Sequence, residues 1–195
     1  MNQKTNFIKW LAVITMTIDH IGFFLFPGVM WLRIIGRIAF PCFLYTTIQG
    51  VSVTRNFPNY WLRLVGTGVV SILVTSLFGN IWNILFSLAI FSLSLYDRRF
   101  ILPGLLLANF TEYGLYGFLL GWAIKITVDG NRWLGMALIL LLHLPEFGSV
   151  QFFAVFALLP FCLPFPYKLP RLPKWLGYAY YPIHQLILIG IGWYL

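Results

Sequence analysis

Four ionisable residues lie close together in the sequence, inside apolar stretches where charged groups are rare. Asp19 and His20 are near the end of a first apolar segment, and Arg33 and Arg37 follow in the next one at helical i, i+4 spacing. Ionisable groups at membrane depth are costly, so they usually mark a polar site and need partners. Histidine can exchange a proton near neutral pH, and an arginine fork can hold a carbonyl, carboxylate or phosphate group. This cluster is therefore the first candidate for a site of acid–base chemistry.

The positions of the four residues in the sequence predict a different role for Asp19 than for His20. Adjacent residues on a helix point about 100° apart, so Asp19 does not face His20. We expect Asp19 to pair with Arg33 or Arg37 and to offset the burial of a guanidinium group. His20 is then available as a general base. In the alternative interpretation, His20 only hydrogen-bonds a neighbouring helix, and Arg33 extends its charge to the membrane interface.

Further polar residues lie later in the chain. His184 is near the middle of the last apolar segment, two residues after Pro182, which has no N–H for the carbonyl of Tyr178. A freed carbonyl, tyrosine hydroxyls and an imidazole predict a polar patch inside the membrane. Glu112 lies between two short apolar runs, where a solvated loop acid is the alternative. We expect His143, beside a proline at a segment end, to be structural or interfacial.

Composition excludes a soluble domain of ordinary kind. The chain has 195 residues, of which 60% are hydrophobic and 9% are charged, and its mean hydropathy is +0.85. A soluble surface cannot be built from this balance, so we expect one transmembrane domain over residues 1–195. The net charge of +8 comes from basic residues placed singly or in twos, which does not predict nucleic-acid binding. Cys42 and Cys162 lie in apolar segments and predict free, buried thiols with no metal site.

The elements that must position the polar residues are membrane-spanning helices. Long runs without alternation exclude barrel strands, so the fold class is all-α, a polytopic transmembrane bundle of about nine spans. Some runs are shorter than the roughly 20 residues that an upright span needs. The segments are Phe7–Phe26, Trp31–Gly50, Tyr60–Phe78, Ile81–Tyr96, Phe100–Phe110, Tyr113–Thr127, Arg132–Leu144, Val150–Phe165 and Trp175–Leu195. Glu112 interrupts 100–127, which leaves open whether this part is two spans or one broken helix.

Basic residues predict the orientation of these spans. With the N-terminus in the cytoplasm, the inner side receives Lys4, Lys9, Arg55, Arg63, Arg98, Arg99, Lys125, Arg132, Lys168, Arg171 and Lys174. The predicted outer loops contain neither Lys nor Arg. We expect a multi-pass protein of the bacterial cytoplasmic membrane, with its first apolar segment retained because no small-residue cleavage site follows it. A short turn at 27–30 makes the first two helices antiparallel neighbours, and Gly22 and Gly36 allow their close approach.

Several motifs in this order resemble one known family. The first two segments contain Lys9–Ala12, Met16–Gly22 and Leu32–Pro41, and Glu112–Gly117 and Tyr180–His184 follow later. Together these motifs span most of the chain and resemble the TraX family of membrane proteins, named for the acetylase of conjugative pilin. The motif Glu112–Gly117 resembles the family's acidic-Tyr-Gly motif, but it begins with Glu where Asp is expected. The last is similar to the family's terminal Tyr-Pro-x-His.

The resemblance implies an acetyl-CoA-dependent transferase. It marks Asp19, His20, Arg33, Arg37, Glu112, Tyr113 and His184 as site residues. Our hypothesis is an integral membrane acetyltransferase that moves an acetyl group from cytoplasmic acetyl-CoA to a hydroxyl or amine in the outer half of the membrane. The acceptor class stays open among surface glycans, anchored polymers and pilin-like peptides.

Each candidate residue has an expected role in this hypothesis. His20 is the general base, Arg37 with Arg33 stabilises the oxyanion, and His184 positions the thioester or protonates the leaving thiolate. The expected catalytic residues are Asp19, His20, Arg37 and His184; those expected near acetyl-CoA are Arg33, Arg37, Arg55, Arg63, Arg98 and Arg99; those expected near the acceptor are Glu112, Tyr113 and Tyr181. No metal is expected.

Two other functions fit the same polar residues. A small-molecule or proton-coupled transporter also needs ionisable groups at membrane depth, although the chain shows no inverted repeat. A non-catalytic membrane assembly protein would use them only to specify helix packing. The bilayer is a partner in every case.

Overall fold

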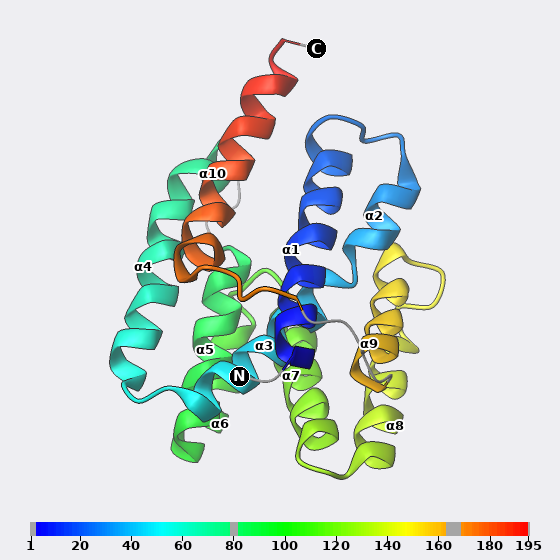
Figure 1. The fold of residues 1–195 in the computed structure, drawn as a ribbon. Helices are drawn as coiled ribbons and strands as arrows, with labels where there is room; N and C mark the ends of the chain where they lie inside the picture. The colour runs from blue at the N-terminus through cyan, green and yellow to red at the C-terminus, as the bar shows by residue number, and fades with distance from the viewer. Residues whose placement is uncertain (1–2, 79–81, 163–168, 195) are drawn as a thin grey trace.

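The computed structural model describes residues 3–78, 82–162 and 169–194, and within them every regular element is a helix. Figure 1 shows their arrangement. The α-helices are Gln3–Phe24 (α1), Met30–Gly36 (α2), Ala39–Val53 (α3), Phe57–Thr75 (α4), Ile84–Tyr96 (α5), Ile101–Ala108 (α6), Gly114–Val128 (α7), Arg132–His143 (α8), Leu158–Cys162 (α9) and Lys174–Gly192 (α10). Short 3₁₀ segments are Ser76–Phe78 (η1), Arg98–Phe100 (η2) and Val150–Ala157 (η3). The predicted loop at 79–80, parts of the predicted spans Ile81–Tyr96, Val150–Phe165 and Trp175–Leu195, and Lys168 of the predicted inner side lie outside the described residues.

The all-helical class is confirmed for the described residues, and their outer surface is apolar. Two stretches, Gln3–Phe24 and Met30–Val53, are long and apolar enough to cross a membrane by length and composition. Large exposed hydrophobic side chains recur at helical spacing on the outer helices: Leu62, Val69, Val70 and Leu73 on α4; Leu102, Leu106 and Leu107 on α6; Ile183, Leu186, Ile187 and Ile191 on α10. Such faces are typical of contact with lipid and support a membrane protein. The count of nine spans and the cytoplasmic N-terminus stay predictions.

The second predicted span is interrupted. Helix α2 ends at Gly36 and α3 begins at Ala39, so Arg37 and Ile38 form a break between them. The N–H of Arg37 is shared between the carbonyls of Arg33 and Ile34, at 3.2 and 3.3 Å, as in a tightened last turn. Pro41 has no N–H to give to the carbonyl of Arg37, which is a sequence reason for the break. The break lies beside the ionisable cluster.

Residues 100–127, which were predicted as either two spans or one broken helix, form the two helices α6 and α7. Helix α6 has eight residues, which span about 12 Å, and α7 begins at Gly114, whose φ of 53° suits a turn without a side chain. Both are shorter than the roughly 30 Å hydrocarbon layer. The predicted span 150–165 also differs, because it begins as the 3₁₀ helix η3 and continues as the five-residue α9. These elements need a thinned bilayer or burial among longer helices.

Side-chain caps and close glycine contacts connect the helices. Asn83 caps α5 by accepting from the N–H of Leu85, and its amide donates to the carbonyl of Gly68 in α4 at 2.9 Å. Helices α7 and α8 pack as a hairpin. At Gly135 the two helices are so close that an added Cβ would overlap Thr127. The largest fully buried side chains include Phe40, Phe91 and Leu120, from α3, α5 and α7. The core therefore lies among these three helices and α1.

Most of the basic turns gather at one end of the bundle. In Figure 1 the start of α1 and the α3–α4, α5–α6 and α7–α8 turns lie at the lower end, while the α1–α2 turn and the end of α10 lie at the upper end. The lower turns and helix starts carry Arg55, Arg98, Arg99 and Arg132. The segment before α10 instead crosses α1, where Trp10 Nε1 donates to the carbonyl of Pro170 at 3.0 Å. The helix then continues through Pro182.

Candidate active site

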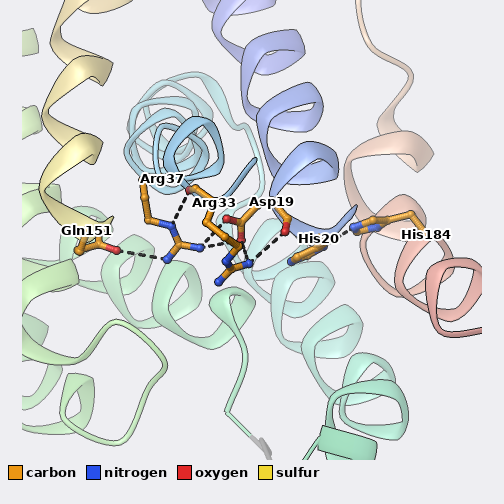
Figure 2. Close-up of polar contacts among 6 residues, drawn as sticks. All are labelled: Asp19, His20, Arg33, Arg37, Gln151 and His184. Atoms are coloured by element: carbon orange, nitrogen blue, oxygen red, sulfur yellow. Dashed lines mark hydrogen bonds and ion pairs between the residues drawn. The ribbon is translucent and has the colours of Figure 1, made fainter. Parts of the chain in front are cut away.

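A buried carboxylate binds two arginines at the centre of the predicted cluster (Figure 2). Arg37 Nη2 donates to both carboxylate oxygens of Asp19, at 2.6 and 2.7 Å. Arg33 Nη1 donates to Asp19 Oδ2 at 2.8 Å and to its backbone carbonyl at 3.0 Å. The expected pairing of Asp19 is confirmed, and it involves both arginines. One carboxylate therefore bridges two guanidinium groups.

Small residues let α1 and α2 approach closely enough for these bonds. A Cβ at Gly36 would overlap the carboxylate of Asp19, and a Cβ at Gly22 would come within 2.7 Å of the Cβ of Leu32. The backbones therefore meet at the two glycines that the sequence singled out. Asp19 is only 9% exposed. Its two arginines replace the water that burial removes.

A chain of hydrogen bonds continues from Arg37 into η3, α7 and α8. Arg37 Nη1 donates to Gln151 Oε1 at 3.3 Å, and Gln151 Nε2 donates to the hydroxyl of Tyr116 at 3.2 Å. That hydroxyl lies 3.0 Å from His143 Nε2, and His143 Nδ1 lies 2.7 Å from the carbonyl of Ile139. His143 is buried and bonded at both nitrogens, which agrees with the structural role expected for it. Neither Gln151 nor Tyr116 was predicted as a member of the site, although Gln151 is a polar residue within an apolar run.

The two histidines of the hypothesis contact each other on the opposite side of Asp19. His20 Nδ1 lies 2.6 Å from His184 Nε2, and His184 Nδ1 lies 2.6 Å from the carbonyl of Tyr180. The ring of Tyr180 stacks on His184, with centroids 4.6 Å apart, and its hydroxyl lies 2.7 Å from Thr17 Oγ1. The polar patch on α10 and the cluster on α1 are thus one continuous group of side chains.

A small cavity lies beside this group. Its volume is about 30 Å³, which suffices for only about one or two water molecules. The lining residues are Met16, Asp19, His20, Gly36, Ala39, Ile84, Glu112, Tyr113 and Tyr181. The structure therefore brings Glu112, Tyr113 and Tyr181 to the same space as His20. Glu112 lies in the turn between α6 and α7, and it is exposed.

A much larger cavity adjoins the small one. Its volume is about 610 Å³, and its lining comes from α1, α3, α4, α5, α10 and the segment before α10. Four basic residues line it: Lys9, Arg55, Arg63 and Arg171. Much of the remaining lining is aliphatic or aromatic. Three residues, Met16, Ile84 and Tyr181, line both cavities and form the wall between them.

The structure separates the predicted arginines into groups. Arg55 and Arg63 line the large cavity, whereas Arg98 and Arg99 in η2 do not. Arg33 and Arg37 line neither of the two cavities and hold Asp19 instead. The role of each residue stays a prediction. Lys9 and Arg171 had been assigned only to the inner side, and no spacing in the sequence marks them as cavity residues.

Comparisons with known proteins agree with the motif order. The model of the family described as "TraX protein" matches residues 4–192. A protein of Rickettsia prowazekii (strain Madrid E), described as "Uncharacterized protein RP591", is 56% identical over 46 residues, which are 22% of this chain and 18% of that protein. No solved structure matches the chain. Because the family model covers nearly the whole chain and the motifs converge on one site, the chain belongs to the TraX family.

Proposed function

We propose that the protein is an integral membrane acetyltransferase that uses acetyl-CoA as its donor. One observation carries the proposal: a large cavity with basic residues shares a wall with the small cavity that holds His20. An acyl-CoA is long, anionic at one end and reactive at the other. The two cavities offer cationic groups and a candidate base at the two ends of such a molecule.

The cationic part of the large cavity suits the phosphate groups of the donor. Arg55, Arg63 and Arg171 line it, and within the described residues none of the three is in an ion pair. Arginine forms bidentate, charge-assisted bonds with phosphate. The apolar lining beyond them suits the pantetheine arm, which would direct the thioester towards Met16 and Tyr181. The wall must open by side-chain movement, because the small cavity is too small for an acetyl group.

The chemistry proposed at the wall is a single acyl transfer. His20 removes the proton of an acceptor hydroxyl or amine as that atom attacks the thioester carbonyl carbon. The tetrahedral oxyanion collapses, the carbon–sulfur bond breaks, and the proton on His20 passes to the leaving thiolate. Arg33 and Arg37 lie near, beside the carboxylates of Asp19 and Glu112, and their guanidinium groups favour the oxyanion. Glu112, Tyr113 and Tyr181 line the remaining cavity and would hold the acceptor.

Thiol release tests this function. Purified protein in detergent or nanodiscs is supplied with acetyl-CoA and with membrane lysate as the source of acceptors, and free CoA is measured. The proposal expects release that His20→Ala abolishes while the variant keeps its folded melting profile. Normal turnover in that variant would exclude His20 as the base.

Binding of the donor is tested separately. The double variant Arg55→Gln/Arg63→Gln is expected to lose affinity for CoA, measured by calorimetry. The matched control is Arg98→Gln/Arg99→Gln, which removes the same charge from the same end of the bundle, away from the large cavity. Equal losses in both would indicate nonspecific attraction, and no loss in either would remove the donor site from this cavity.

One feature also fits a carrier. Interrupted helices that line a site are common in transporters, and α2 and α3 are interrupted at Arg37. Uptake of a labelled substrate into proteoliposomes without any consumption of acetyl-CoA would favour that function over acetyl transfer. If no CoA binds and no substrate moves, the assembly-protein hypothesis remains.

A further inference from the structure

The two imidazoles of the site form a hydrogen bond in the plane of their rings. His20 Nδ1 and His184 Nε2 are 2.6 Å apart, the ring centroids are 4.8 Å apart and the ring planes differ by 13°. Two coplanar rings with this separation are joined edge to edge, so that an N–H of one points at the lone pair of the other. One of the two nitrogens must therefore donate.

A backbone carbonyl decides which nitrogen donates. The carbonyl of Tyr180 can only accept, and it lies 2.6 Å from His184 Nδ1, so that nitrogen carries the proton. In a neutral His184 the other nitrogen, Nε2, then has a lone pair and accepts. The proton between the rings must be on His20 Nδ1. The remaining nitrogen of His20, Nε2, is left with a free lone pair.

We infer that His184 is a positioning residue that holds His20 as the Nδ1–H tautomer and so keeps Nε2 free to act as the base. The inference rests on the proposed acetyl transfer for its consequence, although the tautomer can be observed without it. In the reaction, His20 Nε2 takes the acceptor's proton and later gives it to the thiolate. The bond from His20 Nδ1 to His184 remains throughout. Which nitrogen is protonated is commonly set in this way by the bond that the other nitrogen makes.

The surroundings hold His184 itself in place. It is only 5% exposed. The ring of Tyr180 stacks on it at 5° between planes, and the Tyr180 hydroxyl is held by Thr17 from α1. A neutral imidazole supplies no negative charge here, unlike the carboxylate of a Ser-His-Asp triad. Its proposed effect is on tautomer and orientation.

Nitrogen NMR of the histidine rings tests the tautomer. The chain has three histidines, so ¹⁵N-histidine labelling of the full-length protein in micelles gives three ring systems, which the His143→Gln and His184→Gln variants assign. We expect His20 to be protonated at Nδ1 and unprotonated at Nε2. His143, whose Nδ1 also faces a carbonyl four residues earlier, serves as an internal reference for that state. A His20 ring protonated at Nε2, or at both nitrogens, would overturn the inference.

Two variants of His184 test its role. In His184→Gln the amide oxygen replaces the Nε2 acceptor, so His20 should remain the Nδ1–H tautomer. In His184→Leu the acceptor is lost, and the His20 signals should move towards the Nε2–H form while those of His143 stay. If the tautomer of His20 is unchanged in the leucine variant, His184 does not position it. If the leucine variant does not fold, the spectra of the wild type and of His184→Gln still show whether His20 is the Nδ1–H tautomer. An Nε2–H form in either spectrum would overturn the inference.

The kinetic readout separates this role from packing. His184→Leu should lower kcat by about 100-fold or more, the usual size of a general-base effect, with little change in the KM for acetyl-CoA. His184→Gln should restore most of that loss. Equal loss in both variants would indicate that only the ring's shape matters. If the spectra are as expected but no variant and no wild-type protein transfers acetyl groups, the proposed function fails while the tautomer stands.

Discussion

Arg37 holds both carboxylate oxygens of Asp19 through a single nitrogen, Nη2, at 2.6 and 2.7 Å. Its other two nitrogens also have partners, since Nε donates to the carbonyl of Arg33 and Nη1 donates to Gln151. The side chain is therefore locked in place, and it joins α1 to the break between α2 and α3. This relationship makes Asp19 the residue on which the local fold most depends.

Asp19→Asn is expected to destabilise the protein strongly. The change leaves two largely buried guanidinium groups without their anion, and removing one partner of a buried ion pair costs about 3–5 kcal/mol. Thermal or denaturant unfolding in detergent measures the loss. The matched control is Asp97→Asn, because Asp97 pairs with the exposed Arg99 at 4.0 Å and such surface pairs contribute at most about 1 kcal/mol. Similar losses in both variants would contradict the central role of Asp19.

Gly36→Ala should also destabilise the protein, because the new Cβ would overlap the Asp19 carboxylate. Overpacking of this kind costs about 1–3 kcal/mol. Gly66→Ala in α4 is the control, since no heavy atom lies within 4 Å of its added Cβ, and alanine favours a helix over glycine by about 1 kcal/mol. The melting temperatures of the two variants are expected to move in opposite directions. A neutral Gly36→Ala would mean that α1 and α2 are not held at this distance.

Gln151→Leu is expected to loosen Arg37 without removing its ion pair. The variant leaves the Tyr116 hydroxyl without one donor and the Arg37 Nη1 without its acceptor. For partly buried hydrogen bonds such as these the expected loss is about 0.5–1.5 kcal/mol each. Tyr116→Phe in the same background should cost less than it does alone, because the bond from Gln151 is already lost and only the contact with His143 Nε2 remains. A double-mutant cycle measures this coupling. Fully additive losses would contradict the chain from Arg37 to His143.

Met16→Phe is expected to slow acetyl transfer by enlarging the wall between the two cavities. Met16 is buried and lines both of them, so a larger ring should lower kcat more than it weakens acetyl-CoA binding. Val13, one turn earlier on α1, lines only the large cavity. Val13→Phe should therefore raise the KM for acetyl-CoA and leave kcat less affected. If Met16→Phe instead raised the KM and Val13→Phe lowered kcat, the thioester would not pass the wall at Met16.

Local chemistry was sufficient to predict the partners of Asp19. A carboxylate in an apolar segment needs a cation, and the nearest arginines lie across a four-residue turn, in a helix that must return beside the first. Gly22 and Gly36 were identified for the same reason, since close helices need small residues at the contact. The helical class followed from the long apolar runs, which the described helices confirm.

The interruption at Arg37 was not predicted, although Pro41 carries a signal for it. A proline removes one backbone bond four residues earlier, but many helices in membranes continue through proline, as α10 does at Pro182. Only the packing around a helix decides whether the freed carbonyl is tolerated. Sequence spacing alone could not distinguish these two outcomes.

The amino-acid sequence by itself determined that the protein is helical and apolar, and that its few buried charges must find partners nearby. Only the tertiary structure decided that His20 meets His184 across 164 positions, that Gln151 holds Arg37, and that Glu112 lines the cavity of His20. The physical reason is that burial forces a charge to be neutralised by whichever group its neighbours provide. Contact between distant helices depends instead on their depth, rotation and length, which the whole packed bundle sets.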